Sequence, residues 1–125
     1  MAASVRDINA QTNLGFVVLS GDVTGQGSLE ELKTAKGLLD PLKIPLRIIP
    51  GNHDTKWSES GATDFARLWK ADRFVFEFGG FKFIGIHQGP LMKMGDGHWA
   101  PQDVRWLDGV LAKTDKNQPL IFITH

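Results

Sequence analysis

Three short polar clusters each follow an apolar run of the sequence, and their side chains are of the types that bind divalent metals. The clusters are Gly21-Asp22, Gly51-Asn52-His53-Asp54 and Thr124-His125. Hard or borderline divalent cations accept carboxylate, amide oxygen and imidazole ligands, and loops at strand ends hold such short side chains on a rigid base. We therefore predict a metal site formed by Asp22, Asn52 and His125.

The segment between the first two clusters predicts how they meet. Apolar residues 16–19 and 44–49 are typical of buried strands, and Ser28 with Glu31 predicts a capping box that starts a helix between them. A strand, a helix and a strand in this order form a βαβ unit, whose strands are parallel neighbours. The carboxyl ends of such strands share one edge of the sheet, and we expect both clusters there.

Two further helices are expected. Residues 61–70 show helical spacing of apolar side chains, and Pro101 is typical of the first position of a helix. The helix that begins at Pro101 places Val104, Leu107 and Leu111 on one face, which we expect to pack inward.

A hairpin and a last strand complete the predicted elements. Strand-like segments 74–78 and 81–86 flank Gly79-Gly80, and two glycines at this place strongly indicate a tight hairpin turn. The alternating Phe residues of the two segments are expected in the core. An apolar run over residues 120–124 predicts the strand that carries His125.

In this order and setting, the three clusters resemble three of the five motifs of calcineurin-like metallophosphoesterases. Gly27, five positions after Asp22, fits the same pattern, and the Gly51-Asn52-His53-Asp54 tetrapeptide is its most specific part. The resemblance covers nearly the whole chain. It implies an α/β fold, a partial two-sheet β-sandwich flanked by helices, with residues 1–125 as one incomplete domain and the site at the carboxyl ends of strands.

The resemblance also implies a role for each residue of the clusters. Asp22 would bridge two metal ions, and Asn52 and His125 would bind the second of them; manganese, iron and zinc all suit these ligands. His53 would protonate the leaving alkoxide or steady the phosphoryl oxygens, and Asp54 would hold the His53 ring. The implied reaction is hydrolysis of a phosphomonoester or phosphodiester by two ions about 3.5 to 4 Å apart.

The chain departs from the family pattern at two motifs. It contains no Asp-x-His before residue 16 and no Gly-His-x-His after the last strand. Of the ligands in the family pattern, the second metal therefore lacks one, and the first metal retains only Asp22. We therefore expect little or no phosphatase activity from these 125 residues. The alternative is a non-catalytic module that binds a metal or a partner protein, and a plain structural domain is a third interpretation.

Composition limits the partners. Fourteen basic and fourteen acidic residues give a net charge of zero, and no run of like charges predicts binding to nucleic acid or to an anionic membrane. The sequence has neither a signal-peptide pattern nor a long apolar segment, and it leaves localisation open. A sandwich without its outer strands has open sheet edges, and we expect self-association through them.

Two other histidines flank a glycine-rich loop. His87 and His98 lie on either side of Asp96, and neither matches a ligand position of the family pattern. We interpret both as solvated or bonded to a backbone partner, with contact to a substrate as the alternative.

Overall fold

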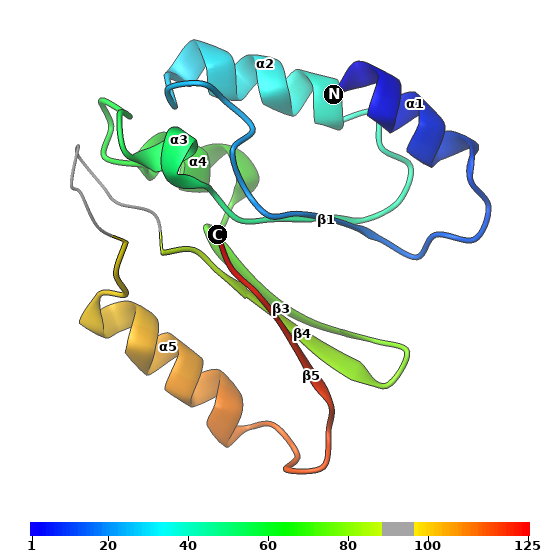
Figure 1. The fold of residues 1–125 in the computed structure, drawn as a ribbon, viewed down its shortest axis with the longest axis vertical. Helices are drawn as coiled ribbons and strands as arrows, with labels where there is room; N and C mark the ends of the chain where they lie inside the picture. The colour runs from blue at the N-terminus through cyan, green and yellow to red at the C-terminus, as the bar shows by residue number, and fades with distance from the viewer. Residues whose placement is uncertain (89–96) are drawn as a thin grey trace.

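The computed structural model describes residues 1–88 and 97–125, whose helices and strands form two layers (Figure 1). The elements are α1 Ala2–Ala10, β1 Val17–Leu19, α2 Leu29–Leu39, β2 Leu46–Ile48, α3 Asn52–Thr55, α4 Thr63–Trp69, β3 Arg73–Phe78, β4 Phe81–Ile86, α5 Pro101–Ala112 and β5 Leu120–Ile123. Strands β1 and β2 form one sheet, and β3, β4 and β5 form the other in that order. The expected α/β class with two sheets and flanking helices is confirmed.

The first layer is the predicted βαβ unit. Ser28 Oγ accepts a hydrogen bond from the Glu31 N–H at 3.3 Å, and the Glu31 carboxylate accepts from the Ser28 N–H at 3.1 Å, which confirms the capping box. Helix α2 buries Leu32 and Leu39 against Phe65 of α4. Strands β1 and β2 pair in parallel, so their carboxyl ends lie at one edge of the sheet.

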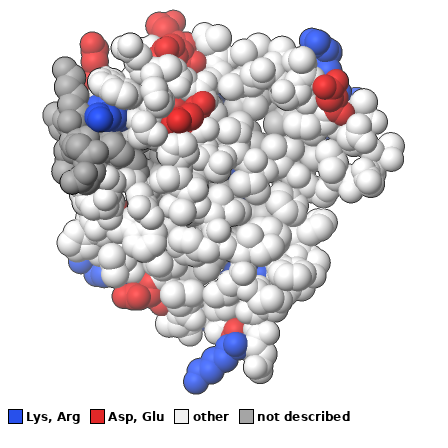
Figure 2. Space-filling model, viewed as in Figure 1, with Lys and Arg blue, Asp and Glu red and all other residues white. Residues whose placement is uncertain are grey.

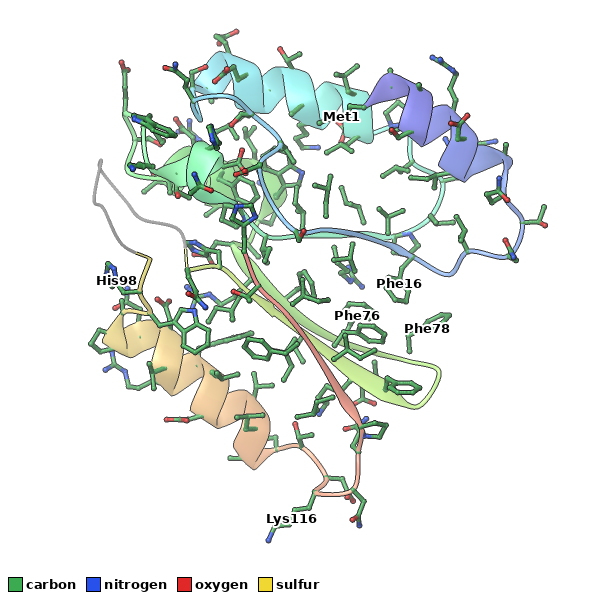
Figure 3. The ribbon with its side chains drawn as sticks, in the orientation of Figure 1. Met1, Phe16, Phe76, Phe78, His98 and Lys116 are labelled. Carbon is green, nitrogen blue, oxygen red and sulfur yellow. The ribbon has the colours of Figure 1, made fainter. Side chains whose placement is uncertain are left out.

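The second layer is built on the predicted hairpin. Gly79 and Gly80 both have positive φ, 59° and 85°, as a tight turn between antiparallel strands requires. Phe16, just before β1, packs edge-on against Phe76 and Phe78 with ring centroids 4.9 and 5.1 Å apart, and this aromatic contact joins the two layers (Figure 3). Phe78 nevertheless stays 51% exposed, so the hairpin Phe residues are only partly in the core.

Helix α5 packs against the second sheet less closely than expected. Its polar contacts include an ion pair between Arg73 and Asp103 at 2.8 Å, and just after the helix Lys82 Nζ donates to Thr114 Oγ1 at 3.0 Å. No residue of α5 is fully buried, and Val104 is 43% exposed. The prediction that its apolar face packs inward is therefore correct only in part.

Two helices were absent from the sequence-based prediction. Helix α1 has no side-chain cap, and only Val5 of it is fully buried, so its sequence carries little signal. Helix α3 occupies part of a segment expected to be a loop, because the Asp54 carboxylate accepts from the Gly51 N–H at 2.9 Å and closes a turn. No helix in the described ranges is both long and apolar enough to cross a membrane.

Candidate metal centre

The three predicted ligands lie at the carboxyl ends of strands from both sheets. Asp22 follows β1, Asn52 follows β2 as the first residue of α3, and His125 follows β5, whose end lies between the layers (Figure 1). His125 Nε2 is 3.0 Å from Asn52 Oδ1 and 3.4 Å from Asp22 Oδ1. The structure thus brings His125 close to two side chains that lie 73 and 103 residues earlier in the sequence.

The hydrogen bonds of His125 define which ring nitrogen faces the other two side chains. Its Nδ1 lies 2.6 Å from the Ser20 carbonyl oxygen, which can only accept, so Nδ1 carries the proton. In the neutral ring Nε2 then presents a lone pair to Asn52 Oδ1 and Asp22 Oδ1. Three acceptor atoms that face one another are stabilised by a cation between them, and the donor set fits a divalent metal.

The third ligand of this set is an amide oxygen. Among residues 1–88 and 97–125, no three His, Cys, Asp or Glu side chains form a group that could hold a metal ion. Any cation bound here would therefore need the Asn52 amide oxygen beside Asp22 and His125.

Two glycines allow the loops that carry Asp22 and Asn52 to approach each other. Gly21 has φ of +105°, and a Cβ there would lie 2.5 Å from the Gly51 nitrogen. A Cβ on Gly51 would lie 2.2 Å from Asp22 Oδ1. Asp22 itself has φ of +54°, which non-glycine residues rarely adopt. The site therefore depends on backbone conformations that side chains would block.

Asp54 has a different position from the one expected. The His53 ring is held by the Gly25 carbonyl, 2.7 Å from Nδ1, and not by the Asp54 carboxylate. Asp54 is fully buried and instead accepts hydrogen bonds from the segment that follows Asp22 and from the Gly51 N–H. The expectation that Asp54 orients His53 is therefore corrected, because the carboxylate joins backbone segments.

His53, on helix α3, lies next to the three candidate ligands. Its backbone N–H donates to Asp22 Oδ1 at 3.0 Å, and its ring packs against Trp57 with centroids 5.1 Å apart. Because Nδ1 donates to the Gly25 carbonyl, Nε2 is the ring atom left to exchange a proton. The predicted acid is thus fixed in orientation next to the candidate metal ligands.

A second polar cluster contains His87, which the sequence left with two interpretations. Arg73 donates to Asp72 at 2.8 Å and pairs with Asp103 at 2.8 Å, while His87 Nε2 lies 3.7 Å from Asp72. The neighbouring His87 ring, followed by the hydrogen bond with Arg73, holds the pKa of Asp72 well below its usual range. The same carboxylate raises the pKa of Arg73.

This cluster lines a pocket of about 180 Å³ together with His98. His87 thus lies beside the Asp72 carboxylate, a side chain, where the sequence predicted solvent or a backbone partner. Asp96 lies outside the described residues. Sequence reasoning missed the pairing of Arg73 with Asp103, because one residue begins β3 and the other lies in the first turn of α5. On the molecular face shown in Figure 2, charged side chains of both signs are scattered.

Comparisons with known proteins identify the family to which the chain is similar. A sequence model described as calcineurin-like phosphoesterase matches residues 2–125. The chain is 28% identical over 122 residues to a probable glycerophosphodiester phosphodiesterase GpdQ of Arcobacter nitrofigilis, which covers 94% of this chain and 44% of that protein. It is 43% identical over 44 residues to a probable cyclic nucleotide phosphodiesterase of Vesicomyosocius okutanii, covering 35% of this chain and 19% of that protein.

A third relative is similar over a shorter segment. The glycerophosphodiester phosphodiesterase GpdQ of Enterobacter lignolyticus is 50% identical over 40 residues, covering 32% of this chain and 14% of that protein. The chain spans less than half of the length of each of these three curated relatives.

Proposed function

This chain belongs to the calcineurin-like phosphoesterase family, and from that membership we propose that it forms part of a metal-dependent site that hydrolyses phosphodiesters. The observation that carries the proposal is the meeting of Asp22, Asn52 and His125, with His125 Nε2 at 3.4 and 3.0 Å from the other two side-chain oxygens. Families of this kind generally use divalent metals, and the three acceptor atoms suit manganese, iron or zinc.

Asp22, Asn52 and His125 are the proposed metal ligands. Asp22 and Asn52 would bind the cation through Oδ1, and His125 would bind it through Nε2, with Nδ1–H fixed on the Ser20 carbonyl. When bound, the cation would polarise a phosphoryl oxygen and neutralise negative charge on the phosphate. Asp22 would also be shared with a second cation.

His53 would act as the general acid. Its Nδ1–H is fixed on the Gly25 carbonyl, so the proton for the leaving alkoxide would come from Nε2. The hydrogen bond from the His53 N–H to Asp22 Oδ1 keeps the acid and the metal ligand in one arrangement. The role proposed for Asp54 is to hold the segments that carry these groups.

The diester preference is supported by the names of the relatives. Three of them are called phosphodiesterases, two for glycerophosphodiesters and one for cyclic nucleotides. We propose a phosphodiester for this chain too. Because its sequence contains neither Asp-x-His nor Gly-His-x-His, we further propose that the 125 residues hydrolyse it slowly.

The test compares two substrates and two proteins. The purified chain is assayed with Mn²⁺ on bis(4-nitrophenyl) phosphate, a diester, and on 4-nitrophenyl phosphate, a monoester, beside Asp22→Ala. We expect slow release of nitrophenol that depends on Mn²⁺, favours the diester and is lost in the variant. Equal rates for Asp22→Ala and the wild type would exclude the site, faster hydrolysis of the monoester would exclude the diester preference, and rapid turnover would exclude the impairment.

A further inference from the structure

The buried carboxylate of Asp54 joins the two loops that carry Asp22 and Asn52. We propose that Asp54 is a positioning residue, whose hydrogen bonds set the separation of these two side chains and thereby the affinity of the site for its cation. The inference rests on the proposed function, because it assumes that Asp22 and Asn52 bind a metal.

Four hydrogen bonds support this role. Asp54 Oδ1 accepts from the Thr24 N–H at 3.0 Å and from Thr24 Oγ1 at 2.6 Å. Asp54 Oδ2 accepts from the Val23 N–H at 3.3 Å and from the Gly51 N–H at 2.9 Å. One carboxylate therefore holds the two residues after Asp22 and the residue before Asn52.

The burial of the Asp54 carboxylate strengthens these hydrogen bonds. Asp54 is 0% exposed, so water does not replace a lost partner, and each buried hydrogen bond to a charged group is stronger than one at the surface. Three of its four donors are backbone N–H groups, so losing the acceptor would release the loops themselves. An Asn side chain at this position offers one acceptor oxygen where Asp offers two.

Thr24 provides a milder way to weaken the same connection. Its hydroxyl donates to Asp54 Oδ1 and accepts from the Gly27 N–H at 3.0 Å, so it also fixes the course of the loop after Asp22. Val has nearly the shape of Thr and lacks the hydroxyl, whereas Ser keeps the hydroxyl. Thr24→Val and Thr24→Ser therefore form a matched pair.

The experiment measures Mn²⁺ affinity by isothermal titration calorimetry, and thermal unfolding without metal, in five variants of the chain. Asp54→Asn should bind Mn²⁺ about 10- to 100-fold more weakly, the range found for residues that orient metal ligands. Thr24→Val should bind Mn²⁺ about 5-fold more weakly, which corresponds to the loss of one hydrogen bond. Thr24→Ser should bind Mn²⁺ as the wild type does. Ile84→Val, a buried change in the second sheet, should lower the unfolding temperature and leave Mn²⁺ affinity unchanged.

Each result decides between positioning and mere stability. If Asp54→Asn and Thr24→Val lower the unfolding temperature as Ile84→Val does and keep wild-type Mn²⁺ affinity, the positioning role is wrong. If Asp54→Asn does not fold, the comparison of Thr24→Val with Thr24→Ser decides alone. The fifth variant, Asp22→Ala, separates the two proposals. If Asp22→Ala binds Mn²⁺ as the wild type does, the metal site itself is refuted. If Asp22→Ala loses Mn²⁺ binding while Asp54→Asn and Thr24→Val both bind normally, only the role of Asp54 is refuted.

Discussion

The two layers of this chain differ in how well they bury their apolar residues. In the first layer Leu32 and Phe65 are 0% exposed and belong to one core cluster that also contains Ile48 of β2. In the second layer full burial is concentrated on β4, while Leu111 of α5 and Phe122 of β5 are 42% and 43% exposed. The candidate site takes Asp22 and Asn52 from the well-packed layer and His125 from the end of the exposed strand β5.

The largest difference between the layers should appear in core truncations. Leu32→Ala removes a fully buried side chain from the first layer and should reduce the free energy of unfolding by about 2 to 5 kcal/mol. Leu111→Ala makes the same chemical change at an exposed site on α5 and should cost less than about 1 kcal/mol. Urea unfolding of both variants measures the contrast, and equal losses would show that the second layer is as well packed as the first.

The next effect concerns the junction of the loops at the site. Gly21→Ala places a Cβ 2.5 Å from the Gly51 nitrogen at a φ of +105°, and it should destabilise the chain by about 2 kcal/mol. Gly37→Ala is the matched control, because Gly37 lies inside α2 with nothing within 4 Å of the added Cβ. It should stabilise the helix by about 0.5 to 1 kcal/mol. Losses of the same size in both variants would remove the argument for a required close approach.

A smaller effect is expected where α5 meets β3. The pKa of Asp72 is lowered by the neighbouring His87 ring and by Arg73, so its charged form stabilises the fold. This stabilisation is complete above the unfolded pKa, near 4, and is lost as pH falls below it toward the folded pKa. At pH 7, Asp72→Asn should cost about 1 kcal/mol, since the group is partly exposed.

The pH dependence of that cost is the diagnostic part. The difference in the free energy of unfolding between wild type and Asp72→Asn should shrink as the pH falls from 4 to 2. Asp108→Asn, at an exposed carboxyl of α5, is the control and should show little cost at any pH. A difference that grows between pH 4 and pH 2 would contradict the assigned ion pairing.

The smallest effect on folding is expected at the edge of the second sheet. Strand β5 pairs with β4 on one side, Ile121 is 38% exposed, and the net charge of zero provides no repulsion between copies of the chain. We expect the chain to self-associate through β5, and Ile121→Lys to shift it toward monomer with less than about 0.5 kcal/mol change in stability. Light scattering that finds the wild type monomeric, or the variant equally associated, would contradict this expectation.

Local signals predicted most of the fold. The capping box of Ser28 and Glu31, the two-glycine hairpin turn and the apolar runs each carry their structure within a few residues, and all three are present. Helix α1 was missed because it has no side-chain cap and buries one residue fully. The incomplete packing of α5 was missed because its apolar spacing predicts a face without saying what covers it.

The sequence also predicted which strand-end side chains meet at the site, but not all of their hydrogen-bond partners. The placement of Asp22, Asn52 and His125 near one another follows from polar residues at strand ends, and their meeting agrees with that reasoning. The partner of the His53 ring could not be predicted, because the Gly25 carbonyl that binds it is a backbone atom of a distant loop. The burial of Asp54 likewise depends on how the two loops close over it.

The most direct test of the central claim is the position of a bound cation. Crystals of the chain soaked in Zn²⁺ and measured at the zinc absorption edge should show an anomalous peak about 2.0 to 2.2 Å from a carboxylate oxygen of Asp22, Oδ1 of Asn52 and Nε2 of His125. A peak at another place, or no peak near these three atoms, would contradict the metal site and the function proposed from it.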